Sequence, residues 1–379
     1  MLKLIVDENI AFAGEAFKQF GNVTLLLGRK INNAVLHNTD ILIVRSITNV
    51  NEVLLKNTPV KFVGTATIGT DHIDLDYLKK NNITFADAKG CNAFSVAEYV
   101  VSALLNLAVK FDFSLKNKSI GIVGVGNVGN KVAKFAEALG MKVLLNDPPL
   151  QRNGDTRKFV DLNEILSADI ITLHVPLNLK GIDKTSHLID KEKLSRVKDG
   201  AILINTSRGA VVNNIDLYDA TNRKNLKVVL DVWENEPAVN VELLNEVIIG
   251  TPHTAGYSVE GKVSGTQMIY NSVCDFLSAD RDFPFEEGPP QDSSKRFEVT
   301  DKIETGLEKL ISSIYSIRDD DERMRKMLKM DREESIKYFD SLRKNYPIRR
   351  EFNNYSVKSN NLSEEAKNIL EKLRFKLTT

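Results

Sequence analysis

Short apolar segments alternate with stretches of helical periodicity over the first 255 or so residues of this chain. This alternation is typical of β-α-β units and of a mostly parallel sheet. Parallel strands covered on both faces lose polar alternation, and Ile120–Val123 and Val228–Leu230 carry no polar side chain. The predicted strands are Lys3–Val6, Ile41–Val44, Phe62–Gly64, Ser119–Val123, Lys142–Leu145, Ile170–Leu173, Ala201–Asn205, Lys227–Leu230 and Val247–Ile249. They form two arrays, one before about residue 95 and one from about 117 to 255, so the pattern predicts two α/β domains with mostly parallel sheets.

The remaining segments predict how the arrays are connected and how the chain continues. A long helix from Ser95 to Phe111 would join the arrays, with Ser95 as its N-cap and Glu98 completing a capping box. A polar, proline-containing stretch at 285–294 predicts a linker. Beyond it, about 90 charge-rich residues carry two amphipathic helices and predict a small α+β domain. So short a segment buries little core alone, and we expect it to pack against the main body or a second copy.

Composition narrows the classes of function. Lysine and arginine together number 51, as do aspartate and glutamate, so no overall basic field favours nucleic acid or an anionic membrane as a partner. Cys91 and Cys274 lie far apart in no CxxC pattern, which indicates a reducing compartment, and no spacing of histidines and carboxylates indicates a metal site. The first residues lack signal-peptide features, and the most apolar helical window, Tyr99–Val109, is far short of the roughly 20 residues of a membrane span. We therefore expect a cytoplasmic protein with no membrane partner.

A glycine motif follows the predicted strand Ser119–Val123 and opens a predicted helix at Asn130–Leu139. In a dinucleotide-binding turn the first glycine permits the tight turn, the second lets the backbone approach the pyrophosphate, and the third lets helix pack on strand. The helix N-terminus then offers unpaired N–H groups to phosphate. The motif consists of Gly124, Val125, Gly126, Asn127, Val128 and Gly129. The alternative is a glycine-rich turn in an unrelated α/β protein.

An acidic residue stands at the expected distance from this motif. Asp147 lies 18 residues after Gly129, at the end of the next predicted strand. That is about where a carboxylate meets the 2′-hydroxyl of an adenosine ribose. Because Asp147 would repel a 2′-phosphate, the sequence predicts NAD rather than NADP as the cofactor.

Three polar residues follow predicted strands of the second array, where open parallel sheets place their ligands. They are Arg208, Glu236 and His253. Oxidation of an alcohol by NAD requires a base for the hydroxyl proton and a cation for the substrate's oxygen and carboxylate. His253 would be the base, Glu236 would orient it and raise its pKa, and Arg208 would clamp a carboxylate. A lone histidine is more often a satisfied surface or core residue, so this spacing does not by itself establish catalysis.

Four segments together resemble the D-isomer-specific 2-hydroxyacid dehydrogenase family: Gly124–Gly129, Asn205–Gly209, Asp231–Pro237 and Pro252–Gly256. Further stretches extend the resemblance over nearly the whole chain, namely Val6–Asn9, Val44–Ser46, Phe62–Asp74, Gly90–Val100, Asn146–Pro149, Gly250–Tyr257, Ile317–Asp320 and Leu342–Glu351. The resemblance implies two Rossmann-like doubly wound parallel-sheet domains with a cleft between them, plus a small α+β C-terminal dimerisation domain. The implied bounds are 1–99 with 257–285 for a discontinuous substrate domain, 100–256 for the NAD-binding domain and 286–379 for the dimerisation domain.

The same resemblance implies a reaction and residue roles. The reaction is NAD-dependent oxidation of 4-phospho-D-erythronate at its 2-hydroxyl, a step of pyridoxal 5′-phosphate biosynthesis, with Arg208, Glu236 and His253 as the catalytic residues. Besides the glycine motif, the implied cofactor-binding residues are Asp147, Val175, Asp231 and Gly256, and the implied substrate-binding residues are Ser46, Thr67 and Tyr257. Val175 stands where relatives are expected to have threonine, so a backbone contact to NAD is expected there rather than a hydroxyl contact. A homodimer formed through the C-terminal domain is also implied.

Several groups could hold a phosphorylated hydroxy acid. The loop Gly64–Thr70 and Arg45 follow strands of the first array and could offer N–H, hydroxyl and guanidinium donors, although a plain turn and a structural ion pair remain alternatives. Lys89, Arg343–Lys344 and Arg349–Arg350 are further phosphate candidates, with a charged surface as the favoured interpretation of the basic run. Competing functions are another 2-hydroxyacid dehydrogenase, such as phosphoglycerate dehydrogenase, and a non-catalytic NAD-sensing scaffold. A scaffold would not need all three catalytic residues.

Overall fold

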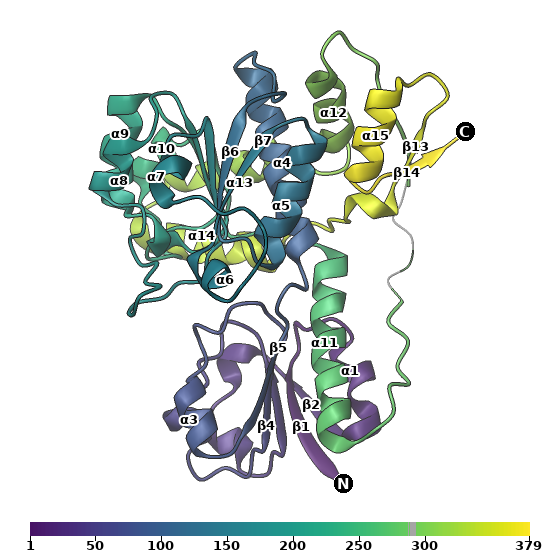
Figure 1. Ribbon diagram of the computed structural model, residues 1–379. Helices are drawn as coiled ribbons and strands as arrows, with labels where there is room; N and C mark the ends of the chain where they lie inside the picture. Colours follow the sequence, from purple (N-terminus) through teal and green to yellow (C-terminus); the bar gives the residue numbers. More distant parts are fainter. Residues whose placement is uncertain (287, 289–292) are drawn as a thin grey trace. The chain divides into compact units, whose positions relative to one another are not determined.

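The computed structural model describes residues 1–286, 288 and 293–379 (Figure 1). Its internal contacts divide the chain into two units. One unit comprises Met1–Asn92 and Ser258–Gly288, and the other comprises Ala93–Tyr257 and Pro289–Thr379. We call them the N-terminal unit and the nucleotide unit. The linker expected at 285–294 lies partly outside the described residues.

The N-terminal unit contains a five-stranded, all-parallel sheet in the order β2-β1-β3-β4-β5. Its strands are β1 (Leu2–Asp7), β2 (Gly21–Leu26), β3 (Ile41–Val44), β4 (Phe62–Thr65) and β5 (Thr84–Asp87). Its helices are α1 (Ala13–Ala16), α2 (Glu52–Leu55), α3 (Leu75–Lys80) and α11 (Val259–Leu277), with short 3-10 turns η1 (Lys18–Phe20), η2 (Gly28–Lys30) and η3 (Asn33–Leu36). This strand order is one of the two common doubly wound arrangements.

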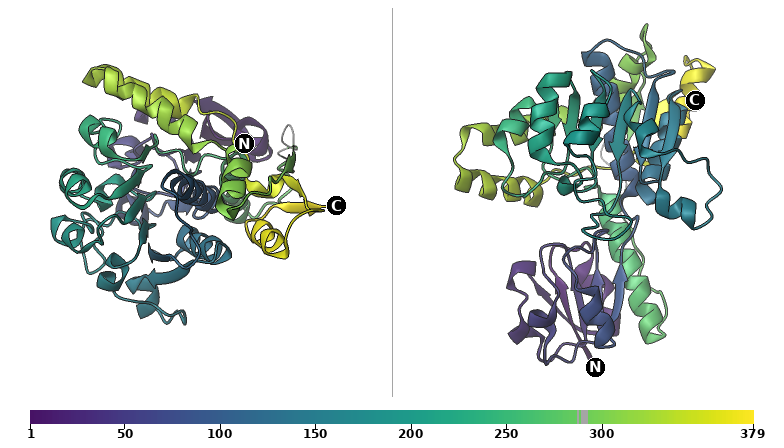
Figure 2. Two further views of the ribbon diagram at one scale, coloured as in Figure 1. Left: turned by 90° about the horizontal axis from the view of Figure 1, so that it is seen from above. Right: turned by 60° about the vertical axis from the view of Figure 1, so that its left-hand side comes forward.

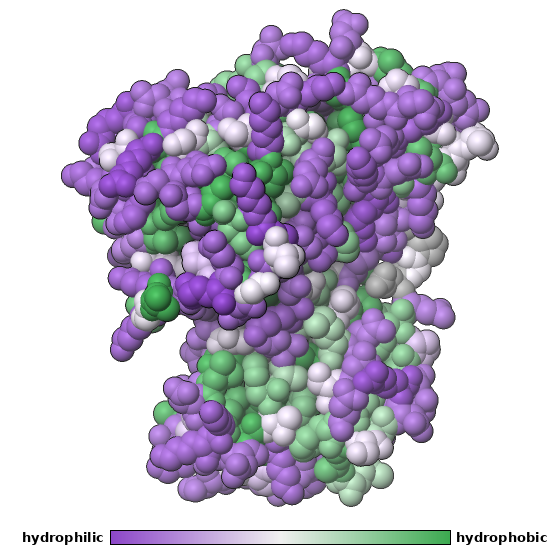
Figure 3. Space-filling model, viewed as in Figure 1, coloured by the Kyte–Doolittle hydropathy of each residue, from purple (hydrophilic) through white to green (hydrophobic). Residues whose placement is uncertain are grey.

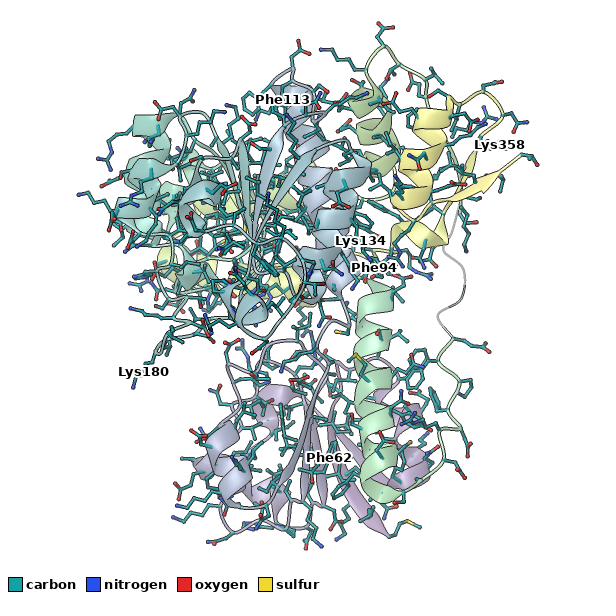
Figure 4. All side chains as sticks on the ribbon, viewed as in Figure 1. Phe62, Phe94, Phe113, Lys134, Lys180 and Lys358 are labelled. Atoms are coloured by element: carbon teal, nitrogen blue, oxygen red, sulfur yellow. The ribbon has the colours of Figure 1, made fainter. Side chains whose placement is uncertain are left out.

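Helix α11 brings the chain back onto this sheet after the second array has been completed. Ile269 packs so closely over β4 that a Cβ on Gly64 would come within 2.6 Å of its side chain. Phe62 of β4, labelled in Figure 4, also meets Phe276 of α11, with 5.2 Å between ring centroids. The core of the N-terminal unit therefore combines residues that are about 200 positions apart in the sequence.

Two strands of this sheet, β2 and β5, are absent from the sequence prediction. Both lie at the sheet edges, and the burial pattern of each mixes exposed with half-buried residues. An edge strand is covered less completely than a central one, so it does not need the continuous apolar run that marked the central strands. The prediction therefore located the buried centre of the sheet and missed its margins.

The nucleotide unit contains a six-stranded parallel sheet in the order β11-β10-β9-β8-β6-β7. Its strands are β6 (Ser119–Val123), β7 (Lys142–Asn146), β8 (Ile170–Leu173), β9 (Ile202–Asn205), β10 (Lys227–Leu230) and β11 (Ile249–Gly250). Its helices up to residue 246 are α4 (Ala93–Lys110), α5 (Asn127–Ala138), α6 (Pro148–Arg152), α7 (Leu162–Leu166), α8 (Lys191–Arg196), α9 (Asn214–Lys224) and α10 (Val241–Glu246), with the turn η4 (Gly209–Val211). All strands predicted for this array are present, and the doubly wound parallel fold is confirmed.

Alternate residues of these strands enter two separate cores. Ile202 and Ile204 of β9 join the core under α4 and α5, whereas Leu203 between them joins the core with Leu217 and Leu243 of α9 and α10. Figure 1 shows α4 and α5 on one side of this sheet and α7–α10 on the other. On the face shown in Figure 3 the outer surface of this unit is mostly hydrophilic. The strands are therefore apolar on both faces because helices cover both faces.

The predicted start of α4 is wrong. The helix begins at Ala93, so Ser95 and Glu98 lie inside it and are fully buried. The Ser95 hydroxyl donates to Glu351 Oε1 at 2.9 Å, and the Phe352 backbone N–H donates to Glu98 Oε1 at 3.0 Å. Both side chains therefore bind the C-terminal part of the chain rather than the helix start. Among the described residues α4 alone is long and apolar enough to cross a membrane, and 83% of it is buried, as in the core helix of a globular domain.

The C-terminal part of the chain belongs to the nucleotide unit. It consists of β12 (Ser294–Arg296), α12 (Ile303–Ser312), α13 (Ile317–Arg325), η5 (Lys326–Lys329), α14 (Arg332–Lys344), η6 (Phe352–Asn354), β13 (Ser356–Lys358), α15 (Glu364–Lys372) and β14 (Lys376–Thr378). Helix α12 packs on α4, α15 packs on α5, and α13 lies along β11 (Figures 1 and 2). The three short strands form a parallel sheet in the order β12-β13-β14. The predicted α+β character of this segment is confirmed, and it shares both cores of the nucleotide unit.

Candidate active site

The loop after β6 has the backbone geometry that a dinucleotide pyrophosphate requires. Gly124 has a φ of +85°, and a Cβ there would lie 2.6 Å from the carbonyl oxygen of His174. A Cβ on Gly129 would lie 1.9 Å from the carbonyl oxygen of Gly124, so only glycine permits this contact of helix with strand. By contrast, a Cβ on Gly126 would have no atom within 4 Å. The backbone at Gly126 therefore faces open space at the start of α5, which begins at Asn127 rather than at the predicted Asn130.

This loop borders a hollow of about 510 Å³. The lining residues are Val125, Gly126, Asn127, Asn130, Leu150 and Arg157. The hollow lies at the carboxyl end of β6, where the strand order reverses between β6 and β8. Such a switch point is where open α/β sheets bind their ligands. The glycine geometry, the hollow and the N-terminus of α5 together fit the phosphates of NAD.

Asp147 is held beside this loop by two backbone contacts. Its Oδ2 accepts from the N–H of Val125 at 2.8 Å, and its Oδ1 accepts from the N–H of Leu150 at 3.0 Å, which caps α6. Each carboxylate oxygen retains a further lone pair that can accept a hydrogen bond. Asp147 therefore braces the glycine loop while it remains able to accept from a ribose hydroxyl.

Two hydrophobic residues of the predicted cofactor site pack around the loop rather than facing open space. Val128 packs against the core under α5. Val175 follows β8, and its Cγ1 would lie 2.8 Å from a Cβ on Gly124. The side chain of Val175 thus supports the tight turn of the glycine loop.

Sequence reasoning missed Arg157, which borders the same hollow. Its Nη1 donates to the carbonyl of Val125 at 3.2 Å and to Asn130 Oδ1 at 3.4 Å. Its Nη2 pairs with Asp155 at 2.6 Å, and hydrogen bonds from Arg157 lower the pKa of Asp155 to about 2. Arg157 therefore places a fixed guanidinium group, paired with Asp155, beside the glycine loop. No sequence signal pointed to it, because it belongs to no motif.

Asp231 fixes the loop that carries His253. Fully buried at the end of β10, it accepts from the Thr251 hydroxyl at 2.6 Å and from the Thr254 and Ala255 N–H groups at 2.8 and 3.0 Å. Its own carbonyl accepts from the His253 N–H at 2.7 Å. Burial raises the pKa of the Asp231 carboxyl, and the charge of His253 together with the three hydrogen bonds to the carboxylate counteracts this cost only in part. This role in holding the loop was not foreseen from the sequence.

His253 and Glu236 form a direct pair. The imidazole Nδ1 is hydrogen-bonded to Glu236 Oε1, and both side chains are half-buried. The Trp233 N–H donates to the second oxygen, Oε2, at 3.2 Å and fixes the carboxylate. His253 itself has a φ of 58°, a left-handed conformation that is uncommon for residues other than glycine and that recurs at functional sites.

The charge state of Glu236 determines which histidine nitrogen is available. Burial alone would raise the pKa of Glu236, but the charge and hydrogen bond of His253, the charge of Arg343 and the Trp233 N–H together lower it below the ordinary value. A deprotonated carboxylate can only accept, so His253 Nδ1 carries the hydrogen of this bond. The lone pair of Nε2 then remains available to accept a proton from a substrate.

Arg208 follows β9 and lies next to the segment that carries Glu236. Its carbonyl accepts from Asn205 Nδ2 at 2.9 Å, and its Nη1 donates to the Ser207 carbonyl at 2.7 Å. Gly209 lies directly against the backbone after β10, since a Cβ there would come within 2.0 Å of the Trp233 carbonyl oxygen. The structure thus places the turns after β9 and β10 in contact, as the strand-end argument predicted.

Residues 251–257 follow β11 and carry His253, and we call them the active-site loop. The C-terminal segment, residues 293–379, packs against the end of this loop. The rings of Tyr257 and Tyr346 meet edge to face, with centroids 5.5 Å apart. Arg349 donates to the carbonyls of Ala255 and Ser95 at 3.0 and 2.7 Å. The prediction of a charged surface for the basic run is wrong at Arg349 and Arg350, which are only 4% and 7% exposed. Arg349 binds the segments that the C-terminal part covers, and Arg350 donates to Asn354 Oδ1 at 3.2 Å within the C-terminal part.

The predicted substrate residues Ser46 and Thr67 lie in the N-terminal unit. Ser46 is exposed just after β3. Thr67 follows the neighbouring strand β4, and its hydroxyl is hydrogen-bonded to that of Thr65 at 2.8 Å. Both therefore stand at the carboxyl ends of adjacent strands, near the β1–β3 switch point of that sheet.

Comparison with known proteins defines the class. Residues 106–255 match the family described as D-isomer specific 2-hydroxyacid dehydrogenase, NAD binding domain, and residues 290–373 match a domain of unknown function (DUF3410). The fold is similar to that of the NAD-dependent formate dehydrogenase of Staphylococcus aureus solved with NAD, with a TM-score of 0.62 and 25% identity over 75% of this chain and 97% of that one. It is also similar to the D-lactate dehydrogenase of Aquifex aeolicus solved with NAD and lactic acid, with a TM-score of 0.57 and 27% identity over 73% and 95% of the two chains. Fold and site thus define an NAD-dependent dehydrogenase of the D-isomer specific 2-hydroxyacid type.

One curated relative narrows this class. The erythronate-4-phosphate dehydrogenase of Proteus mirabilis is 46% identical over 363 residues, which cover 95% of this chain and 96% of the relative. The chain therefore belongs to the erythronate-4-phosphate dehydrogenase family.

Proposed function

We propose that this protein oxidises 4-phospho-D-erythronate at its 2-hydroxyl to 3-hydroxy-2-oxo-4-phosphooxybutanoate, with reduction of NAD, in pyridoxal 5′-phosphate biosynthesis. The observation that carries the proposal is the His253–Glu236 pair, which lies on the same unit as a glycine loop shaped for NAD. The 46% sequence identity with the erythronate-4-phosphate dehydrogenase of Proteus mirabilis, over 95% of this chain, supports the choice of substrate.

His253 provides the base for this reaction. Its Nε2 accepts the proton of the 2-hydroxyl while the C2–H bond breaks and the C2–O bond becomes a carbonyl. Glu236 holds the ring in the required tautomer and stabilises the imidazolium that forms, as the carboxylate of a catalytic triad does. When bound, NAD supplies the acceptor for the hydride that leaves C2. Arg208 would hold the substrate carboxylate by two parallel hydrogen bonds.

The remaining roles follow from the resemblance and from chemistry. Ser46, Thr67 and Tyr257 would contact substrate, Asp147 the adenosine ribose and Asp231 the nicotinamide amide, with Val175 and Gly256 contacting NAD through the backbone. We assign substrate binding to 1–99 with 257–285, NAD binding to 100–256 and dimerisation to 286–379. A homodimer in the cytoplasm is the state in which we expect the protein to act.

Replacing Glu236 by glutamine should lower kcat by roughly 10- to 1000-fold. The glutamine amide can donate to His253 Nδ1, which favours the tautomer with its hydrogen on Nε2 and removes the base. Steady-state rates with 4-phospho-D-erythronate measure the loss. A kcat equal to that of wild type would show that Glu236 does not act on His253.

The substrate assignment predicts reduced-nicotinamide formation with 4-phospho-D-erythronate and far less with 3-phosphoglycerate. Both substrates are assayed by absorbance, each with and without an added 2-oxo acid. Turnover that requires the 2-oxo acid would indicate that the cofactor stays bound and is reoxidised on the enzyme. A preference for 3-phosphoglycerate would show that the substrate assignment is wrong. Inactivity on both acids despite tight NAD binding would favour the non-catalytic scaffold.

A further inference from the structure

Helix α14 of the C-terminal segment brings a second guanidinium group to the active-site loop. Arg343 lies near the end of this helix, and its guanidinium carbon is 6.0 Å from the centroid of the Tyr257 ring. Arg343 therefore contacts the residue of the nucleotide unit that we assign to substrate binding.

Arg343 also lies within the electrostatic range of the catalytic pair. Its positive charge is one of the influences that lower the pKa of Glu236. In return, although burial opposes it, the charges of Glu236 and Asp231 and the contact with Tyr257 raise the pKa of Arg343. An anion bound at this guanidinium would therefore interact electrostatically with Glu236, the partner of His253.

The hydrogen-bonding capacity of Arg343 is not used up by the protein. Its Nε hydrogen is buried and has no acceptor among the residues that the structure describes. A buried donor without an acceptor is costly, and for a charged group the cost is larger than for a neutral one. A bound ligand that carries acceptor oxygens would remove this cost.

The position of Arg343 is fixed by the surrounding packing. Four residues earlier on α14, Phe339 is fully buried in the core that also contains Trp233. Two residues after α14 ends, the Tyr346 hydroxyl donates to the buried carboxylate of Asp320 at 2.7 Å, and its ring packs on Tyr257. A guanidinium held between such anchors is preorganised for a ligand.

We propose that Arg343 of the C-terminal segment is a substrate-binding residue that holds the phosphate of the substrate. This inference rests on the proposed function, because it requires a phosphorylated hydroxy acid. Such a substrate carries two anionic ends. With its carboxylate on Arg208 and its 2-hydroxyl at His253, the phosphate at C4 needs a separate cation, and the planar fork of arginine suits phosphate oxygens.

The test compares substrates that differ only in the phosphate. For wild type and Arg343→Met, kcat/KM is measured with 4-phospho-D-erythronate and with D-erythronate. If D-erythronate is not turned over, its inhibition constant is measured instead, with the phosphorylated acid as the substrate. We expect the preference for the phosphorylated acid to fall by roughly 10- to 100-fold in Arg343→Met, the range of a charge-assisted hydrogen bond. Arg343→Lys retains the charge but loses the planar fork, so its preference for the phosphorylated acid should lie between those of wild type and Arg343→Met. Lys344→Met removes the same charge from the exposed neighbouring position and should keep the wild-type preference.

The outcomes separate this inference from the proposed function. Equal losses with both acids in Arg343→Met would overturn it and leave Arg343 as a residue that only orients Tyr257 or Glu236. A wild-type preference retained in Arg343→Lys and Arg343→Met alike would also overturn it. A wild-type enzyme that is inactive on 4-phospho-D-erythronate would instead contradict the proposed function. Thermal unfolding and NAD titration of each variant show whether a loss of activity reflects a loss of folded protein.

Discussion

Replacing His253 by asparagine should lower kcat for 4-phospho-D-erythronate by roughly 10²- to 10⁴-fold, the usual contribution of a positioned base. Asparagine tolerates the left-handed backbone that His253 adopts, at a φ of 58°, so the loop should keep its conformation. The glycine loop and Asp147 are untouched by the change, and NAD affinity should stay within a factor of a few of wild type. Steady-state rates and a fluorescence titration with NADH measure the two quantities.

The chain offers a matched control for this substitution. His187 also has a left-handed backbone, with a φ of 50°, and its Nε2 is hydrogen-bonded to Glu234 at 2.5 Å. It lies on the same unit but follows no strand of the site. His187→Asn should therefore leave kcat within a factor of a few of wild type. Equal activity of the two variants would remove His253 from the mechanism.

The sequence was sufficient to find the strand ends that carry chemistry. Arg208 and Glu236 follow the neighbouring strands β9 and β10, His253 follows the edge strand β11, and the carboxyl ends of parallel strands meet at one edge of a sheet. In the structure, His253 is hydrogen-bonded to Glu236, and Gly209, directly after Arg208, lies against the backbone of Trp233. What these residues do in catalysis stays a prediction until the variants are measured.

The residues that hold the candidate active site in place could not be found from local sequence patterns. Asp231 binds residues 20 to 24 positions away through one hydroxyl and two backbone N–H groups, and backbone partners leave no trace in residue identity. Arg349 reaches the carbonyl of Ala255 across 94 positions. Such contacts depend on how the C-terminal segment packs, which neither periodicity nor spacing determines.

Ser95 and Glu98 show that a local sequence pattern can also give a wrong prediction. Their spacing matches a capping box, and the local rule predicted a helix start at Ser95. In the structure both are inside α4 and bind Glu351 and Phe352 instead. Burial, with Glu351 adding to it, raises the pKa of Glu98 well above the ordinary value, and Arg374 pairs with Glu98 and Glu351 at 3.3 and 2.9 Å. The two residues of the predicted capping box thus make long-range contacts with the C-terminal segment instead of capping the helix.

Deleting residues 293–379 should therefore prevent the nucleotide unit from folding. The segment contributes fully buried apolar side chains to both cores, among them Leu307, Met327, Phe339, Phe352 and Leu370. At about 1.5–3 kcal/mol for each buried side chain, these five alone contribute on the order of 10 kcal/mol, comparable with the whole stability of a typical domain. The deletion would also leave Glu98 buried without Arg374 and the Phe352 N–H. Solubility, circular dichroism and NADH binding of the 1–292 fragment measure the outcome.

A pair of point substitutions tests the same packing within the full-length chain. Phe352 is fully buried and stacks on Phe375 with centroids 4.9 Å apart, so Phe352→Ala should lower the free energy of unfolding by about 3–5 kcal/mol. Ile348 lies four residues earlier on the same segment and is 87% exposed, so Ile348→Ala should change it by less than about 0.5 kcal/mol. Denaturant titration followed by tryptophan fluorescence reports on the nucleotide unit, since Trp233 is the chain's one tryptophan and lies in its core. A soluble 1–292 fragment that binds NADH, together with a stable Phe352→Ala protein, would mean that the C-terminal segment is an appendage and not part of the core that holds the active-site loop.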